Sequence, residues 1–404
     1  MEQAEEILSS DLRAAVVKNL RWDRETGLPS HRKPPSEQQI AEAILQTVPP
    51  QHSAALSEDA LGRATLAVAG ELSGAGPLHW LLTLPRVTDV LVNGPREVWV
   101  DRGTGLEQTA VDLGDEHAVR DLAVRMAQAC GVRLDDALPY ADGQLPDGTR
   151  FHAILAPHSG HCTAISLRVP AADHRQFGEL LSSGMVPQKA SRVLLQLVSR
   201  RTNYLITGAT GSGKTTLLGA LLGQVPPDER ILCIEQAAEL RPNHPHFVRL
   251  LAREANVEGA GGVSMELLVR QAMRMRPDRL VLGECRGSEV REVLAALNTG
   301  HQGGCATLHA NSAADVPARL EALGALAGMS REALAAQAAA GLDAIIHLRR
   351  HVNGQRQVSE IAVLARDEQG TLRAENAISF DDDGSPKLGA AWPAFHRRLA
   401  GRSP

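Results

Sequence analysis

Gly208-Ala-Thr-Gly-Ser-Gly-Lys-Thr215 is the stretch of this 404-residue sequence that decides the fold. It matches the pattern G-x-x-x-x-G-K-[ST] at every fixed position. Glycines let the main chain pass close to phosphate oxygens, and successive N–H groups at a helix N-terminus make the cavity between them positive. The stretch therefore predicts a loop that binds the phosphates of a nucleotide.

The side chains of this loop have separate expected roles. The Lys214 ammonium can reach the β- and γ-phosphates, and the Thr215 hydroxyl can ligate Mg²⁺, so ATP and Mg²⁺ are the expected ligands. A glycine-rich turn without a ligand is the alternative, but here the loop lies between the apolar strand expected at Tyr204–Thr207 and a helix expected to end at Leu222. The expected nucleotide-binding residues are Gly208, Ala209, Thr210, Gly211, Ser212, Gly213, Lys214, Thr215 and Thr216.

Two later strands are expected to end in acidic residues. Glu284 follows the apolar run Leu280–Leu282 and is the candidate for the Mg²⁺ shell, through water. A second apolar run ends in Ile234-Glu-Gln-Ala-Ala-Glu239, which we expect to lie beside the loop, one strand over. Glu239, or second Glu235, would polarise the attacking water, the step that separates a hydrolase from a nucleotide binder. A solvated pair of surface acids is the alternative.

Two histidines flank a glycine-rich segment further along the chain. In Thr299–Asn311, the pair Gly303-Gly304 precedes a short apolar run that ends at His309. We expect His309 to contact the γ-phosphate, with His301 as a second site residue. Metal binding by the two histidines is less favoured because no further ligand residues cluster nearby.

The chain is long enough for two domains and terminal segments. Strand–helix alternation around the loop predicts an α/β domain of the RecA type, and shorter strand-like runs before it predict a smaller α/β domain. Ser36 and Gln39 predict a capping box that opens a helix ending near Val48. The expected divisions are an N-terminal helical extension (1–76), the smaller domain (77–170), a linker (171–187), the RecA-like domain (188–365) and a polar C-terminal tail (366–404).

Composition, net charge and cysteine spacing favour some classes of protein over others. Hydrophobic residues make up 43% and charged residues 22%, a globular balance. The net charge of −5 argues weakly against direct nucleic-acid binding. The five cysteines show no C-x-x-C spacing, which favours reduced thiols in a cytoplasmic protein. No signal peptide or membrane-spanning run is visible, so any membrane association is expected to be peripheral.

These motifs, in this order, resemble the secretion ATPases of type II and type IV secretion systems, where they are called Walker A, Asp box, Walker B and His box. The preceding domain resembles that of the tight-adherence (Tad/CpaF-like) branch of that superfamily, and the resemblance as a whole covers about residues 77–365. The segments that carry this second resemblance are Thr88–Pro95, Leu145–Arg150, Ile165–Arg168 and Arg201-Thr-Asn203.

The resemblance implies a homo-hexameric ring whose subunits have a PAS-like N-terminal domain before the RecA-like domain. It implies that arginines of the N-terminal domain, by position Arg150 and Arg168, reach the phosphates; surface ion pairs are the alternative for each. It also implies a motor on the inner face of the cytoplasmic membrane, which acts on platform proteins during assembly of a tight-adherence or type IVb pilus.

Two residues depart from the family pattern. Gln236 stands where an Asp is usual in the Asp box, and Gln144 stands where an Arg is usual before Leu145. Both differences remove charge near the expected phosphates, although Glu235, Glu239 and Arg150 are kept. A conjugation-type ATPase and a nucleotide-regulated scaffold with slow hydrolysis therefore stay open beside the pilus motor.

Overall fold

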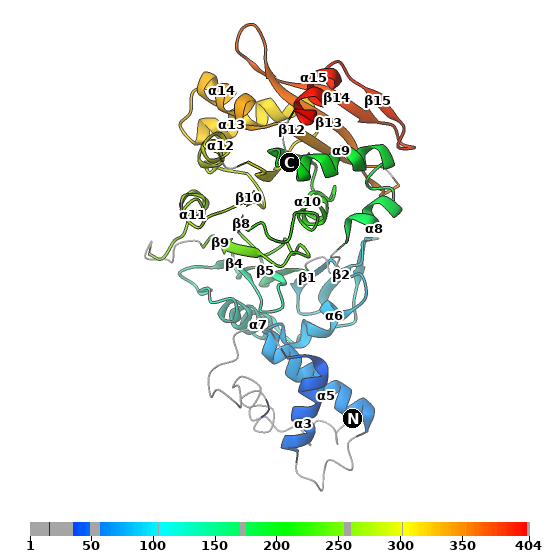
Figure 1. Ribbon diagram of the computed structural model, residues 1–404. Helices are drawn as coiled ribbons and strands as arrows, with labels where there is room; N and C mark the ends of the chain where they lie inside the picture. Colours follow the sequence, from blue (N-terminus) through cyan, green and yellow to red (C-terminus); the bar gives the residue numbers. More distant parts are fainter. Residues whose placement is uncertain are drawn as a thin grey trace. The chain divides into compact units, whose positions relative to one another are not determined.

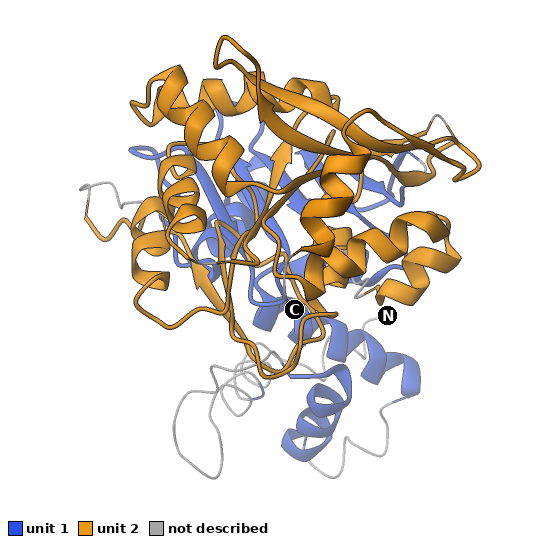
Figure 2. Cartoon of the chain, turned by 45° about the horizontal axis from the view of Figure 1, so that its top comes forward, with its two compact units in different colours: residues 1–171 blue, residues 172–404 orange. Residues whose placement is uncertain are grey.

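The computed structural model describes residues 16, 35–48, 57–103, 105–169, 175–253, 260–300, 302–351 and 353–401. The chain forms two compact units, residues 1–171 and 172–404 (Figure 2). Residues 1–15 and 17–34 of the expected helical extension, and the site residue His301, lie outside the described residues. Each unit has its own hydrophobic core.

Unit 1 begins with a pair of capped helices. The Ser36 side chain accepts from the Gln39 N–H, and the Gln39 side chain accepts from the Ser36 N–H, which confirms the predicted capping box. Ile40 and Ile44 are buried with Val68 of the next helix. The helices of this region are α3 (Glu37–Thr47), α5 (Glu58–Ser73), η1 (Gly76–Leu78) and α6 (His79–Thr83).

The rest of unit 1 is an antiparallel sheet with one apolar face. Its strand order is β3-β2-β1-β6-β5-β4. Alternate side chains such as Val90, Val98 and Phe151 are buried with Val119 and Met126 of α7 (Glu116–Ala129), because successive residues of a strand point to opposite faces. The strands are β1 (Asp89–Gly94), β2 (Glu97–Asp101), β3 (Leu106–Gln108), β4 (Tyr140–Gln144), β5 (Arg150–Ile154) and β6 (Ala164–Arg168).

Unit 2 is built on a nine-stranded sheet in the order β15-β14-β13-β12-β7-β11-β10-β8-β9. Figure 1 labels β8, β9, β10 and β12 to β15 of this sheet. The six neighbouring strands β12, β7, β11, β10, β8 and β9 are parallel. Strands β13, β14 and β15 continue the sheet with antiparallel pairing. The strands are β7 (Tyr204–Gly208), β8 (Ile231–Glu235), β9 (Phe247–Leu251), β10 (Arg279–Leu282), β11 (Cys305–His309), β12 (Ala344–Arg350), β13 (Arg356–Arg366), β14 (Leu372–Phe380) and β15 (Pro386–Leu388).

Helices cover both faces of this sheet, which explains why β7, β8 and β10 are buried at every residue. One core contains side chains of α8 (Phe177–Ser182), α9 (Gln188–Ser199), α10 (Lys214–Leu222) and α15 (Trp392–Ala400). The opposite core contains side chains of α11 (Met265–Ala272), α12 (Val290–Asn298), η2 (Ala313–Asp315), α13 (Val316–Leu326) and α14 (Arg331–Gly341). This is the α/β architecture expected from the sequence.

Two segments have more structure than the sequence indicated. The expected linker contains α8, whose Phe177 and Leu180 are buried in the core. The expected C-terminal tail contains β14, β15 and α15, and Phe380 and Phe395 are buried there. The expected domain boundaries stay predictions, but residues 372–400 belong to the sheet of unit 2 and its covering layer.

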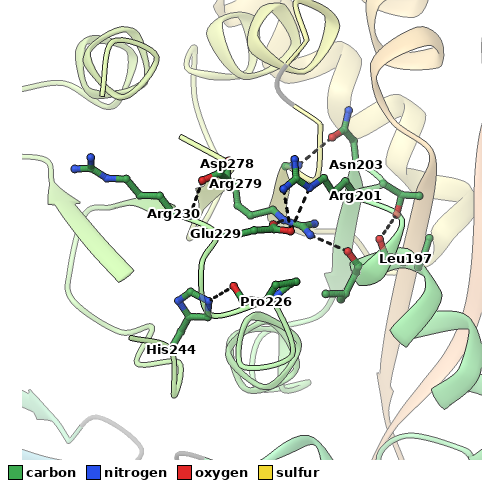
Figure 3. Close-up of polar contacts among 12 residues, drawn as sticks. Leu197, Arg201, Asn203, Pro226, Glu229, Arg230, His244, Asp278 and Arg279 are labelled. Carbon is green, nitrogen blue, oxygen red and sulfur yellow. Dashed lines mark hydrogen bonds and ion pairs between the residues drawn. The ribbon is translucent and has the colours of Figure 1, made fainter. Parts of the chain in front are cut away.

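A buried ion-pair network joins the N-terminal ends of three central strands (Figure 3). Arg279, the first residue of β10, donates to Glu229 at 2.5 Å and to the Val198 carbonyl at 2.9 Å. Arg201, just before β7, lies 3.0 Å from the same carboxylate. A Cβ added at Gly303 would lie 2.4 Å from Arg279 Nη1, so the first glycine of the Gly303-Gly304 pair makes room for this network.

Candidate nucleotide-binding site

The Gly208–Thr215 loop connects β7 to α10 at the C-terminal end of a central strand, as predicted. Gly208, Gly211 and Gly213 have φ values of 150°, 74° and 96°, a region that favours glycine. A Cβ at Gly208 would also lie 2.5 Å from the Leu348 carbonyl oxygen on β12. The glycines are therefore required by the path of the main chain, which leaves the N–H groups at the start of α10 available to a ligand.

Lys214 lies folded back over the loop. Its Nζ donates to the Gly208 and Ala209 carbonyls, at 2.9 Å each, and lies 3.3 Å from His309 Nδ1. Burial lowers the pKa of Lys214, and the negative charge of Glu284 opposes that shift. The ammonium is thus held at the loop by weak carbonyl partners, which phosphate oxygens can replace.

His309 joins the lysine to the acid at the end of β10. It is the last residue of β11 and is paired in register with Gly208. Its Nε2 lies 3.0 Å from Glu284 Oε1. Burial, then the charge of Lys214, lowers the pKa of His309, while Glu284 opposes the shift. Three residues singled out from the sequence therefore form one contiguous chain, Lys214–His309–Glu284.

The strand order corrects one sequence-based expectation. Glu235 and Glu239 were expected one strand from the loop, but β10 and β11 lie between β8 and β7. Glu284 likewise follows a strand that is separated from β7 by β11. The reason is that parallel crossovers place later strands between earlier ones, so chain order is not sheet order.

The Glu235 carboxylate is held by hydrogen bonds within the turn that follows β8. It is 3% exposed, and its carboxylate accepts hydrogen bonds from the Glu239 N–H at 3.1 Å, the Leu240 N–H at 2.8 Å and Arg249 Nε at 2.9 Å. Burial raises its pKa. The Glu239 side chain is exposed. Leu240 is buried with the side chains of α10, so this turn runs back over the helix that follows the phosphate loop.

Arg150 and Arg168 lie opposite each other in unit 1. They are register partners on β5 and β6, and both side chains are exposed. Arg168 Nε lies 3.1 Å from Asp89 Oδ1 on β1. Gln144 donates through Nε2 to the Gly148 carbonyl at 2.9 Å and so closes the turn that leads into Arg150.

The sequence interpretation missed the contribution of β12. His347 is buried on this strand, and its Nδ1 lies 2.9 Å from the Thr207 hydroxyl, one residue before the loop. Burial lowers the pKa of His347. A contact between residues 140 positions apart has no local signal in the sequence.

The donor set fits a nucleotide with a divalent cation. Thr215 and Glu284 supply oxygen ligands of the kind Mg²⁺ prefers. The Ser212 hydroxyl within the loop is buried and has no hydrogen-bond partner among the described residues. An unsatisfied hydroxyl beside a buried lysine is suited to a bound anion.

Comparison with known proteins identifies the family. The model of the type II/IV secretion system protein family matches residues 71–381. Two putative conjugal transfer proteins of Mycobacterium tuberculosis strains are each 51% identical over 336 residues, 82% of this chain and 95% of theirs. Conjugal transfer protein TrbB of Rhizobium radiobacter is 29% identical over 303 residues, 74% of this chain and 90% of that protein. The Legionella pneumophila ATPase DotB has a similar fold, with a TM-score of 0.50 and 20% identity over 71% of this chain and 78% of its own.

The match confirms the resemblance to the secretion ATPases, while the tight-adherence branch stays a prediction. In the part of the chain that the structure describes, no helix is long and apolar enough to cross a membrane. With a phosphate loop, a strand-end glutamate and a strand-end histidine in one RecA-like sheet, the chain belongs to the type II/IV secretion system protein family and is one of its P-loop ATPases.

Proposed function

We propose that this protein is the ATP-hydrolysing motor of a pilus or secretion apparatus and that it works as a homo-hexameric ring. The observation that carries the proposal is the Lys214–His309–Glu284 chain, with contacts of 3.3 Å and 3.0 Å, at the mouth of the phosphate loop. In such a chain, the lysine and the histidine can both contact the phosphate that is cleaved, while the acid orients the histidine ring.

Each residue of the site has a proposed role. Lys214 exchanges its carbonyl partners for the β- and γ-phosphates, and neutral His309 contacts the γ-phosphate while Glu284 orients its ring. Thr215 and, through water, Glu284 hold Mg²⁺, which when bound neutralises charge on the phosphate oxygens. Glu239 orients the attacking water, and Glu235 positions the turn that carries Glu239.

Arg150 and Arg168 are proposed to complete the site from the N-terminal domain. Like charges directly opposite each other on neighbouring strands destabilise a sheet. Asp89 offsets part of that cost at Arg168, and a phosphate held between the two guanidinium groups would gain charge-assisted hydrogen bonds from both. Their register on β5 and β6 supports this role for both arginines.

We propose a tight-adherence or type IVb pilus as the apparatus, served from the inner face of the cytoplasmic membrane through platform proteins. The segments Thr88–Pro95 and Leu145–Arg150 support this choice. A conjugation-type ATPase is the second candidate, because the relatives at 51% identity are putative conjugal transfer proteins. A scaffold with slow hydrolysis is the third, because Gln236 lacks the charge usual at its position.

Deletion of the gene in its native host, with complementation by the wild type or by Glu284→Ala, tests the proposal. We expect surface pili to disappear on deletion and to return only with the wild type. Loss of DNA transfer with pili intact would support the conjugation-type ATPase instead. Full rescue by Glu284→Ala would contradict a motor and leave the scaffold.

A further inference from the structure

The hairpin between β12 and β13 lies beside the phosphate loop, on the side away from His309. Strand β12 is a parallel neighbour of β7, with Leu348 opposite Gly208, while β11 and His309 flank the other edge of β7. Strand β12 continues two residues past that register position, to Arg350. The end of β12 therefore runs alongside the point where the loop leaves the sheet.

Two arginines of this hairpin lie against glycines of the loop. A Cβ added at Gly211 would lie 3.6 Å from Arg350 Nη1, and one added at Gly213 would lie 3.2 Å from Arg356 Cδ. The Arg350 guanidinium thus lies beside Gly211, in the space that a side chain at that position of the loop would approach. Larger residues at Gly211 and Gly213 would be strained by their φ values in any case.

Arg350 is an exposed cation at the end of β12. Arg350 is exposed and is paired in register with Arg356, so two cations lie opposite each other on adjacent strands. Within the described ranges, the Arg350 side chain has no hydrogen-bond or ion-pair partner, whereas that of its neighbour Arg349 forms an ion pair with Asp382. A cation kept beside a like charge and next to an anion-binding loop is suited to an anionic ligand.

We propose that Arg350 is a nucleotide-binding residue, which contacts in cis the phosphates held by the loop from the β12 side. The inference rests on the proposed function and adds a residue to its site. A guanidinium binds phosphate oxygens through two parallel hydrogen bonds, which a point charge such as Lys214 does not offer. Lys214, His309 and Glu284 gather on the β11 side, where His309 is proposed to contact the γ-phosphate. Arg350 lies on the other side of the loop, so we expect it to bind the phosphates that ADP and ATP have in common.

Equilibrium titration of the full chain with ADP and with a non-hydrolysable ATP analogue, each with Mg²⁺, tests the proposal, because the wild type is expected to hydrolyse ATP itself. We expect Arg350→Ala to weaken both affinities about 10- to 100-fold, the effect of losing a hydrogen bond to a charged partner. Arg350→Lys should lose less, because it keeps the charge. Arg349→Ala, which removes an equal charge one residue away, should bind like the wild type. Thermal unfolding of each variant checks that the fold is kept.

The outcomes separate this inference from the proposed function. Wild-type affinity of Arg350→Ala for both nucleotides would overturn the role of Arg350 and leave the motor intact. Equal losses in Arg349→Ala and Arg350→Ala would also overturn it, since any nearby charge would then suffice. A fall in turnover with both affinities unchanged would contradict it too. A wild-type chain that binds neither nucleotide would refute the proposed function itself.

Discussion

At the scale of single residues, two glutamates four positions apart have opposite surroundings. Glu235 is buried and accepts three hydrogen bonds from its own turn and from Arg249, whereas the Glu239 side chain is exposed. A carboxylate with these fixed partners stabilises the turn that contains them. The exposed side chain is the one that can approach a water molecule, which favours Glu239 as the residue that orients it.

Substitution of one glutamate should lower the rate of ATP hydrolysis, and substitution of the other should lower the stability of the fold. Glu239→Ala should lower the rate of ATP hydrolysis by ~100-fold or more and change the free energy of unfolding by less than ~0.5 kcal/mol. Glu235→Ala should lower the free energy of unfolding by ~3 kcal/mol, because it leaves Arg249 and two N–H groups without their acceptor. Steady-state kinetics and urea unfolding measure the two effects. A stable, inactive Glu235→Ala would reverse the assignment.

Several residues of the proposed site have local signals in the sequence, so their places at strand ends could be predicted. The loop, Glu284 and His309 each follow an apolar run, so their strand-end positions are visible without a structure. The burial of Glu235 and the contacts of His347 and Arg350 could not be predicted. They depend on which strands are neighbours, and the partner of His347 is 140 positions away.

At the scale of elements, the central strands are joined at both ends by polar contacts. Arg279 and Arg201 meet Glu229 where β7, β8 and β10 begin (Figure 3). At the other end, His347 joins β12 to β7 just before the loop. The strands that carry the site are thus held in register by groups outside the site.

The two arginines on Glu229 should differ in their effect on stability. The Arg279 side chain is 2% exposed and that of Arg201 is 42% exposed. Arg279→Gln should cost ~3 kcal/mol or more, because it leaves a buried carboxylate poorly paired. Arg201→Gln should cost ~1 kcal/mol or less, since water screens that pair. Chemical denaturation of both variants checks the order, and equal costs would contradict a buried network centred on Arg279.

The buried imidazole of His347 should make stability depend on pH. Burial lowers its pKa in the folded state, with Lys214 adding to the shift and Glu360 and Asp315 opposing it. The unfolded chain therefore binds the proton first, and the stabilisation, full above the ordinary pKa of 6.5, is lost as the pH falls below it. His347→Gln should reduce the loss of unfolding free energy below pH 6.5 by up to ~1.4 kcal/mol per pH unit.

Other buried histidines should also make stability depend on pH, so a second histidine substitution is needed for comparison. Burial also lowers the pKa values of His79 and His309, so the wild type should lose stability in acid by more than one route. His396→Gln makes the same replacement at an exposed histidine on α15 and serves as the control for the substitution itself. Identical profiles for His347→Gln and the wild type would exclude the proposed contribution of His347.

Several elements, but not their arrangement, could be predicted from the sequence. The capped helix after Ser36 and the strand before the loop have strong local patterns, and both were found where expected. Strands β13, β14 and β15 were not recognised. Polar and apolar residues mix along them because they extend the sheet beyond its doubly covered centre, and Gly and Asp residues interrupt the segment.

At the scale of the whole molecule, each of the two units has one half of the proposed machinery. Unit 2 contains the phosphate loop with its lysine, acid and histidine, and unit 1 contains the paired Arg150 and Arg168. Each unit also has its own hydrophobic core. The proposed roles therefore predict that substitutions in either unit lower turnover.

Arg168→Ala should lower turnover while leaving nucleotide affinity nearly intact. An arginine that neutralises charge during phosphoryl transfer contributes ~10³-fold or more to the rate in other NTPases, and we expect a loss of at least ~100-fold here. Arg96→Ala removes an exposed arginine of the same unit, paired with Asp112, and should keep full turnover. Kinetics and nucleotide titration measure both, and unchanged turnover of Arg168→Ala would remove Arg168 from the site.

Phosphate release from ATP by the purified full-length chain, followed with malachite green in the presence of Mg²⁺, tests the motor most directly. The wild type should release phosphate steadily. Lys214→Ala should lose release because the phosphates are no longer held, and Glu284→Ala should lose it because the Mg²⁺ shell and the orientation of His309 are disrupted. Release by the wild type no greater than that by Glu284→Ala would contradict an ATP-driven motor.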